Sequence, residues 1–493
     1  MVVTIVILII LATISLNLLF NKNGIIKQAQ LAKEIQANAE TREKEQLGSI
    51  DKEVNKIISN VIKEEKNVAN APDISGFSKS NTYYVTWNLE SSPYAIQETN
   101  NLTQKQPSDW YDYTEGINKW ANIKTTGSGN DCYWVWVPRY AYCITEGYHS
   151  NIAGTIDIKF LKGTTNTPID GSNITISNSS GSGNWNVHPA FWFDKNNNGV
   201  EDDGEQLAGI WVAKYEASSN STDVVENPTA EQLATDGGGN TADLKVRVKP
   251  NVTSWRKINV NNIFTVCRNL TTGGNSLENT NNLDSHMMKN TEWGAVAYLS
   301  RSVYGKNGEV WNNPYYNNTT NRSPITGLCG KATNAKDLST TKLNDTCKYN
   351  EIGGENASTT GNIYGIYDMS GGAYEYVAGI YTGGTSNDNR SNLWDSNNTK
   401  YVNKYTETTG SQSTYYGNVD KYGDAVYEIS NSGASGSNSW DSSCSDFPTE
   451  QATVFSRSGQ AYSGSICGMF AFGRKSGNAD SAGGFRPCLI SLR

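Results

Sequence analysis

Two short segments near the end of this chain constrain its fold more than any others. One reads IYGIYDMSGGAYEYVAG at residues 363–379, and about a hundred residues later the chain closes with GGFRPCLISLR. The Gly-Gly pair permits a turn with positive φ, and Asp368 can accept hydrogen bonds from that turn. Glu375 lies between two tyrosines, so we expect it to be partly buried and to need a partner. Arg486 is the candidate partner, because a guanidinium pairs with a carboxylate through two parallel bonds.

The composition excludes one broad class of function. The chain has 493 residues, of which 18% are charged, and its net charge is −8. This length suffices for two or three domains. A nucleic-acid-binding protein needs a basic stripe against the phosphates, and this composition argues against one. The 13 tryptophans and 27 tyrosines predict a folded core, and they also suit a surface that binds ligands.

The N-terminal segment is apolar and then becomes amphipathic. Residues 1–20 carry no charged side chain, and a helix of about 20 such residues spans the hydrocarbon core of a membrane. Further on, apolar residues recur at helical spacing, at Leu47, Ile50, Val54, Ile57, Ile58 and Val61. We expect an apolar helix over 1–24 that continues as an amphipathic helical stalk over 25–68.

The rest of the chain reads as strands, loops and one clear helix. Residues 69–131 are typical of a linker and small β region, with runs such as TYYVTWNL. From Cys132 on, aromatic and β-branched runs such as YWVWVPRYAY alternate with Gly, Asn and Ser loops, which predicts strands. NTEWGAVAYLSRS predicts a buried helix that Asn290 or Thr291 caps. The expected fold class is α+β, rich in strands and long loops.

Residues 194–205 read DKNNNGVEDDGE and fit the calcium-loop pattern D-x-[DN]-x-[DN]-G-x5-E in full. The sequence therefore predicts calcium as a cofactor, in a loop between strands. An acidic, solvated hairpin tip is the alternative. The expected ligands are the side chains of Asp194, Asn196, Asn198, Asp202 and Glu205 and the backbone carbonyl of Val200.

The eight cysteines form no CxxC pair, which argues against a zinc ribbon or a thioredoxin-like site. The even number fits an oxidising exterior, where disulfides persist. Cys329 and Cys347 bracket a polar loop and are the expected pair. Eight thiols without any disulfide are the alternative.

The N-terminal pattern resembles the first helix of type IV pilin-like proteins, as found in surface proteins of Gram-positive gut anaerobes. The resemblance implies that residues 1–20 lie in the membrane, or in the core of a pilus-like filament with other pilin subunits. It also implies that the stalk packs on a globular head. A plain membrane anchor is the alternative.

Residues 132–493 resemble the formylglycine-generating-enzyme-like domain, a variant of the C-type lectin fold. GIWVAKYEAS resembles its early strand with Glu216, and TEWGAVAYLS resembles its helix. GIYDMSGGAYEYV resembles its DM-x-GN-x-WEW turn, and GGFRP resembles its last strand. The resemblance implies a lectin-like head in which Glu375 and Arg486 are structural.

Formylglycine-generating enzymes oxidise their substrate with copper that two cysteines hold. The equivalent stretch here, FSRSGQAYSGSICGMFAFGR, offers only Cys467, and one thiol cannot make a two-thiolate copper site. His149, His188 and His286 are far apart, and no HExxH, P-loop or GxSxG pattern occurs. We expect no copper and no enzyme, with an oxidase of this group as the alternative.

The segment before GGFRP forms the exposed ligand-binding face in the fold that the chain resembles, including in proteins diversified by retroelements. We therefore expect a displayed binding or adhesion protein at the cell surface, whose ligand is an extracellular protein, a phage or a glycan. A purely structural pilin subunit is a further alternative. The candidates for the ligand-binding face are Trp440, Arg457, Gln460, Tyr462, Phe470, Arg474, Lys475, Asn478 and Asp480.

Overall fold

The computed structural model describes residues 2–16, 68–98, 100–127, 130–202, 204–219, 245–271, 277, 282–316, 323–331, 335–336, 345–461 and 463–492. The chain divides into two compact units, 1–65 and 66–493. The first contains helix α1 (Val2–Leu16), and the expected stalk over 25–68 lies almost wholly outside the described residues. In the described part of the chain, no helix is long and apolar enough to cross a membrane.

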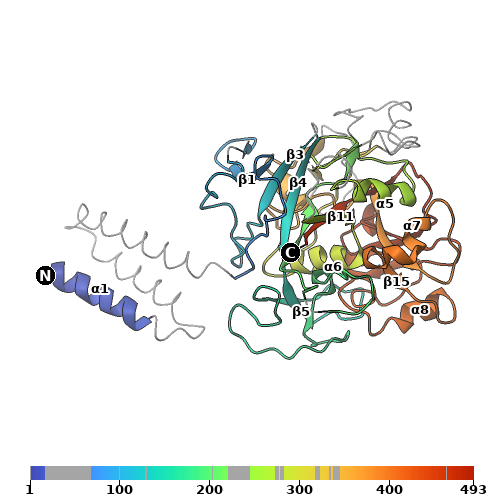
Figure 1. Ribbon diagram of the computed structural model, residues 1–493, viewed down its shortest axis with the longest axis horizontal. Helices are drawn as coiled ribbons and strands as arrows, with labels where there is room; N and C mark the ends of the chain where they lie inside the picture. The colour runs from blue at the N-terminus through green and yellow to red at the C-terminus, as the bar shows by residue number, and fades with distance from the viewer. Residues whose placement is uncertain are drawn as a thin grey trace. The chain divides into compact units, whose positions relative to one another are not determined.

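An antiparallel sheet of seven described strands runs through the second unit (Figure 1). Its tryptophan- and valine-rich central strands are fully or almost fully buried, as expected for strands covered on both faces. The last strand of the chain lies between two strands from the middle of the sequence. The spatial order is β11 (Leu283–Met287), β21 (Pro487–Ser491), β8 (Gly209–Ala213), β4 (Asn130–Pro138), β3 (Asn122–Gly127), β1 (Thr82–Asn88) and β2 (Ala95–Gln97).

This sheet crosses the expected domain boundary at 131/132. Strands β1 and β3 precede the boundary, yet β3 pairs with β4 from Asn122↔Val135 to Gly127↔Asn130. Residues 69–131 therefore do not form a separate region, because their strands complete the sheet of the head.

A second sheet carries the C-terminal segment. Its central strand is β14, which pairs with β18 in antiparallel register and with β15 and β20 in parallel register. Strand β18 pairs in turn with β19. The strands are β14 (Tyr374–Tyr381), β15 (Asn403–Tyr405), β18 (Val454–Arg457), β19 (Phe472–Lys475) and β20 (Gly483–Phe485).

Smaller sheets and short helices complete the head. The strands form a three-stranded sheet and three pairs within the described residues. They are β6 (Ile156–Phe160), β5 (Tyr140–Ile144) and β7 (Asn186–Val187); β9 (Ser218–Ser219) with β10 (Val246–Arg247); β12 (Leu328–Gly330) with β13 (Thr346–Lys348); and β16 (Gly436–Ser439) with β17 (Ser443–Ser445). The described α-helices are α5 (Val260–Arg268), α6 (Asn290–Ser300), α7 (Ser391–Trp394) and α8 (Ser411–Gly417). The described 3-10 helices are η1 (Pro189–Phe191), η3 (Gly354–Ala357), η4 (Ser396–Tyr401), η5 (Trp440–Ser442) and η6 (Gly464–Ile466).

Helix α6 is the helix that the sequence predicts, and it is buried along its whole length. Its N-cap is Lys289 rather than Asn290 or Thr291. The reason is Glu292, whose carboxylate accepts the Lys289 backbone N–H at 2.8 Å, so the helix starts one residue earlier. The mixed α+β, strand-rich class is confirmed.

The predicted pairing of Glu375 with Arg486 is confirmed. Both side chains are fully buried, and two guanidinium nitrogens of Arg486 lie 2.7 and 3.1 Å from the Glu375 carboxylate oxygens. The same guanidinium donates to the carbonyls of Ala213 and Tyr367 at 2.7 and 2.8 Å. Arg486 thus ties strand β14 of one sheet to the end of β8 in the other.

The Gly-Gly turn is also present, with φ of 75° at Gly371 and 70° at Gly372. Asp368 accepts its hydrogen bonds from other loops instead of this turn. Its donors are the Gly327 backbone N–H at 2.9 Å and the Asn313 side-chain amide at 2.9 Å. The motif therefore joins distant loops.

All eight cysteines are thiols in this structure, so the expected Cys329–Cys347 disulfide is not formed. The two residues nevertheless lie directly opposite each other in the β12–β13 ladder. Of the eight, only Cys444 is not fully buried.

Candidate ligand-binding site

The C-terminal segment encloses a hollow of about 190 Å³ beside strands β17, β18 and β19. Its wall combines amide, hydroxyl and charged side chains with aromatic ones. The lining residues are Tyr374, Cys444, Asp446, Ser456, Gly459, Gln460, Ser463, Ile466, Ala471, Phe472, Gly473, Arg474 and Lys475.

The loop between β18 and β19 positions this hollow, and it is anchored to the Gly-Gly turn. Ser458 donates its hydroxyl to the Gly371 carbonyl at 2.8 Å, and the Ala461 N–H bonds the Gly372 carbonyl at 2.9 Å. Cys467 donates its thiol to the carbonyl of Gln460 at 2.7 Å. The motif at 363–379 therefore supports the loop that shapes the hollow.

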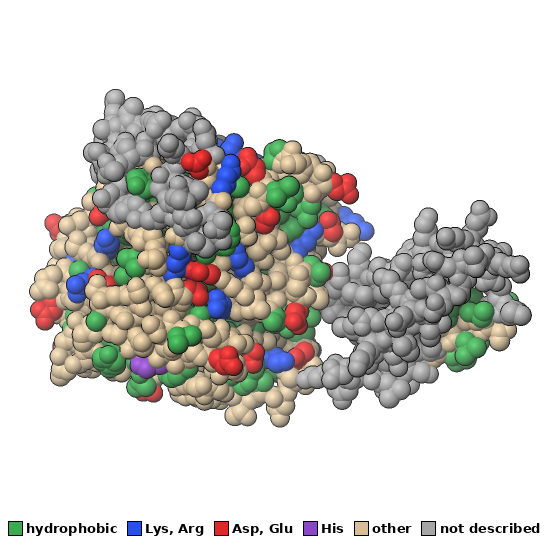
Figure 2. All heavy atoms as spheres, turned by 180° about the vertical axis from the view of Figure 1, so that it is seen from behind, with side chains coloured by type: hydrophobic (Ala, Val, Ile, Leu, Met, Phe, Trp, Pro, Cys, Tyr) green, Lys and Arg blue, Asp and Glu red, His purple; other side chains and the backbone are tan. Residues whose placement is uncertain are grey.

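Two cations of β19 give the hollow its charge. Arg474 is 40% exposed at its side chain and pairs with Asp446 at 3.3 Å. The Lys475 ammonium lies 4.0 Å from the centre of the Tyr374 ring, a favourable cation–π distance. Together with the Gln460 amide, these groups offer hydrogen-bond donors to a bound molecule. Figure 2 shows that Lys and Arg are otherwise scattered among acidic and neutral side chains on the face drawn there.

Three of the sequence candidates lie inside the head. Trp440 is fully buried and donates its indole N–H to the Gly147 carbonyl at 2.9 Å. Phe470 is buried edge-to-face against Trp440, with ring centres 5.2 Å apart. Arg457 is 1% exposed and donates to the Ala425 carbonyl at 2.8 Å. The expectation that these three side chains are displayed is wrong, because packing and internal hydrogen bonds engage them.

The remaining candidates divide between the hollow and its surroundings. Gln460, Arg474 and Lys475 line the hollow. Asn478 is exposed, and its side-chain oxygen accepts from the Asn389 amide at 2.7 Å. Asp480 is half-buried and accepts the Ala482 N–H at 2.8 Å. Tyr462 lies outside the described residues.

The 194–205 loop folds around its own acidic and amide side chains. The Asp194 carboxylate accepts the N–H groups of Asn198 and Gly199 at 3.0 and 2.7 Å. The side-chain amides of Asn196 and Asn198 both donate to one Asp202 oxygen, at 2.7 and 2.8 Å. The oxygens of Asn196 and Asn198 accept backbone N–H groups of the loop at 3.0 and 2.7 Å, so the amide nitrogens, not the oxygens, face Asp202.

The other two expected ligands of this loop, Val200 and Glu205, lie apart from the contacts between the Asn side chains and Asp202. Val200 is exposed, and its N–H bonds the Asn198 side chain at 2.7 Å. Glu205 is buried, and both its oxygens accept N–H groups, from Lys195 at 2.7 Å and from Trp192 at 3.0 Å among others. A metal at Glu205 would compete with these bonds. Among the described residues, no three His, Cys, Asp or Glu side chains are arranged as a metal site.

Cys467, the residue nearest to a copper ligand in the sequence, is fully buried. Burial raises the pKa of this thiol to about 12. Cys444 lines the hollow and its pKa is also raised by burial. Cys467 is therefore enclosed, whereas Cys444 is the thiol that faces the hollow.

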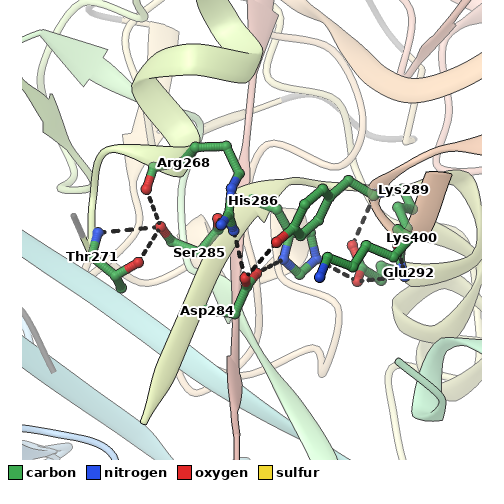
Figure 3. A network of polar contacts seen from close by, with 9 residues as sticks. Arg268, Thr271, Asp284, Ser285, His286, Lys289, Glu292 and Lys400 are labelled. Atoms are coloured by element: carbon green, nitrogen blue, oxygen red, sulfur yellow. Dashed lines mark hydrogen bonds and ion pairs between the residues drawn. The ribbon is translucent and has the colours of Figure 1, made fainter. Parts of the chain in front are cut away.

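A buried charge network around His286 was missed by sequence reasoning (Figure 3). His286 is fully buried, and its two ring nitrogens lie 2.9 Å from Asp284 and 2.7 Å from Glu292. Arg268 pairs with Asp284 at 2.6 Å, and Lys289 lies 3.6 Å from Glu292. Burial opposes a charge on this imidazole, but the carboxylates of Glu292 and Asp284, one at each ring nitrogen, raise its pKa and favour the protonated form.

The other two histidines also have structural surroundings. His149 stacks on Tyr427 with ring centres 4.1 Å apart. His188 is buried beside Tyr140 and Tyr142, and burial lowers its pKa to about 3. The three histidines therefore do not form one constellation. The signal for the His286 network was the D-x-H pattern at 284–286, which places both side chains on one face of a strand.

Comparison with known proteins does not assign this chain to a family. No family model and no curated protein matches the chain. Among solved structures, this chain is distantly similar to Treponema denticola variable protein 1, with a TM-score of 0.26 and 10% identity. The match covers 74% of this chain and 98% of that one.

Proposed function

We propose that this protein is a displayed, non-catalytic ligand-binding or adhesion protein of the cell surface, which binds through the hollow of its C-terminal segment. The observation that carries the proposal is the convergence of Gln460, Arg474 and Lys475 on that hollow. Arg474 and Lys475 come from strand β19 and Gln460 from the loop between β18 and β19, which hydrogen bonds tie to the Gly-Gly turn. A binding site built on supported strands keeps its geometry.

The chemistry of the hollow favours a ligand with acidic or hydroxyl groups. Arg474 and Lys475 contribute two positive charges and Asp446 one negative charge, so the lining is positive. Tyr374 and Phe472 add aromatic surface, which contributes contact area at low entropic cost. An extracellular protein, a phage protein or a glycan can offer such groups.

We propose the formylglycine-generating-enzyme-like variant of the C-type lectin fold for the head. Support comes from the two motifs, whose expected Glu375–Arg486 pair is formed. A retroelement-diversified protein is the corresponding proposal for the C-terminal segment, supported by the short polar and aromatic runs around the hollow.

The N-terminal segment is proposed as a pilin-like helix that anchors the protein in a membrane or filament. Support comes from the charge-free sequence over 1–20 and from helix α1 within it. The exposed apolar side chains of this helix, such as Val3, Leu8 and Leu11, suit burial in lipid or against neighbouring helices.

Calcium in the 194–205 loop is proposed as well. Support comes from the sequence pattern and from the contacts of Asn196 and Asn198 with Asp202, which place three of the expected ligands together; the two amides would turn their oxygens toward a bound cation. Carboxylate and amide oxygens at this spacing suit a hard cation, which would hold the loop in one conformation.

The experiment that tests the function compares three forms of the full chain on an array of extracellular proteins, phage tail proteins and microbial and mucin glycans. The forms are the parent, Gln460→Ala/Arg474→Ala/Lys475→Ala, and the control Lys159→Ala/Lys404→Ala, whose residues lie outside the hollow. We expect the parent and control to bind a shared ligand and the triple variant to lose it, with circular dichroism unchanged. Binding that survives in the triple variant would place the site elsewhere.

A further inference from the structure

A second, larger cavity lies away from the C-terminal hollow. Its volume is about 380 Å³, within the range of sites that hold small ligands. It is formed where the segment 187–192 meets strand β15 and the loop 420–424. The two cavities share no lining residue, so a ligand of one would not occupy the other.

Lys421, which lines this cavity, can donate hydrogen bonds to a bound molecule. Lys421 donates to the Lys404 carbonyl at 3.0 Å, and its ammonium lies 4.7 Å from the centre of the Tyr405 ring. Within the described residues it makes no ion pair with a carboxylate. Burial lowers the pKa of this ammonium. An ammonium has three N–H groups, and only one of them has a hydrogen-bond partner among the residues that the structure describes.

Two further side chains complete a mixed set of donors and acceptors. The Asn403 side-chain oxygen accepts both the N–H and the hydroxyl of Thr291, at 3.0 and 3.2 Å, so the amide still offers its NH₂ group. Asp424 accepts the Tyr405 hydroxyl at 2.7 Å and the Val426 N–H at 3.0 Å, one on each oxygen. Each carboxylate oxygen keeps a second lone pair.

The charge of the lining selects among ligand classes. Glu201, Asp420 and Asp424 are negative and Lys421 is the single cation, so the formal charge of the lining is −2. Such a cavity repels phosphates and other polyanions. The remaining polar groups are mainly neutral amides, and Trp192 and Tyr422 supply aromatic faces.

We propose that this cavity is a second binding site, for a small neutral polyhydroxylated ligand of monosaccharide size. A hydroxyl group both donates and accepts, so a ring of hydroxyls matches the alternation of Lys421, Asn403 and Asp424. Its C–H face packs against an aromatic ring such as Tyr422. This inference does not rest on the proposed function, because it uses none of the residues of the C-terminal hollow.

The test is saturation-transfer NMR and calorimetry on the full chain with methyl glycosides of glucose, galactose, mannose and N-acetylglucosamine. Glucuronate serves as the anionic probe. The variants are Lys421→Met and Tyr422→Leu. The matched control is Lys404→Met, which is also half-buried but does not line the cavity.

We expect at least one neutral glycoside to bind the parent and the control alike. Both site variants should weaken binding about tenfold, the effect of losing one hydrogen bond to a charged group or one stacking contact. Tyr422→Leu keeps the test valid should Lys421→Met fail to fold. Binding of glucuronate alone, binding of none of the probes, or glycoside binding that neither variant weakens would overturn the proposal.

Discussion

Replacing Arg486 should destabilise the head more than any conservative change on the surface. The Arg486→Met change removes four hydrogen bonds at once, two to Glu375 and one each to the carbonyls of Ala213 and Tyr367. The methionine side chain fills much of the space but donates to none of these acceptors. The Glu375 carboxylate and the carbonyls of Ala213 and Tyr367 then stay buried without the donors that Arg486 supplied.

The magnitude follows from the contacts. Breaking a buried ion pair by removing one partner costs about 3–5 kcal/mol. Each buried carbonyl that loses its donor adds about 1–3 kcal/mol. The sum, about 5–11 kcal/mol, is comparable with the whole stability of a typical domain, about 5–15 kcal/mol. We therefore expect Arg486→Met to be largely unfolded at 25 °C.

Replacing the partner, Glu375, should lower the free energy of unfolding less than replacing Arg486. The reason is that three carboxylates, those of Glu375, Asp368 and Glu216, surround the one guanidinium. Burial, and the nearby charges of Asp368 and Glu375, raise the pKa of Glu216 well above its ordinary value. Glu375→Gln removes one of these negative charges, while Arg486 keeps its two carbonyl acceptors and the neighbouring Asp368. We expect a loss of about 1–3 kcal/mol, as for one buried bond left unmade.

The assay is guanidinium denaturation of the full chain, followed by tryptophan fluorescence. Arg474→Met is the matched control, since the Arg474 side chain is 40% exposed and pairs with Asp446, which is itself partly exposed; it should change the stability by less than about 0.5 kcal/mol. The reasoning would be refuted if Arg486→Met unfolded at the same denaturant concentration as the parent. It would also be refuted if Glu375→Gln were the more damaging of the two changes.

Three further predictions concern the buried histidine, the cysteine pair and the acidic loop. Burial opposes the charge on His286, yet Glu292 and Asp284 raise its pKa above the ordinary 6.5. The charged imidazole should therefore contribute its full stabilisation below pH 6.5, and this contribution should fade as the pH rises through the pKa of the folded state. Urea titrations of the parent and His286→Gln should therefore differ most near pH 6, and an equal difference at pH 6 and pH 9 would contradict this. Cys329 and Cys347 face each other across β12 and β13, so oxidised glutathione should link them in a disulfide, with release of reduced glutathione. The disulfide should raise the free energy of unfolding by about 3 kcal/mol, because it closes the loop between the two residues. Peptide mass spectrometry that finds another intramolecular pair first would disprove this prediction. Calorimetry should show calcium binding that Asp202→Asn weakens at least about tenfold and that Asp170→Asn, outside the loop, leaves unchanged; equal binding in both variants would exclude the loop.

The sequence could predict the features that depend on local chemistry or on an obligatory partner. Helix α6 follows from its spacing of apolar residues, although its N-cap lies one residue before the predicted ones. The Glu375–Arg486 pair follows from the cost of burying a carboxylate alone. The turn at Gly371 and Gly372 follows from the need for positive φ, which both residues adopt.

The sequence could not show which face of a short strand points outward. Strands β18 and β19 have four residues each, too few for a reliable period of two. The sequence therefore predicted a surface position for Arg457, whereas the structure shows that its side chain is packed inside the head. The D-x-H pattern at 284–286 could have indicated the Asp284–His286 contact, but the contact with Glu292 depends on the angle at which α6 follows β11, which the sequence pattern does not give. The larger cavity joins residues more than two hundred positions apart and has no local signal.

Hydrogen–deuterium exchange of the full chain, with and without its strongest ligand from the array, tests the central proposal most directly. The account predicts that the ligand slows exchange in the segments 456–460 and 472–475, which carry lining residues of the C-terminal hollow. Exchange in the segment 420–424, beside the separate larger cavity, should stay unchanged. Slower exchange confined to segments outside the C-terminal hollow would contradict the proposal that this protein binds its ligand there.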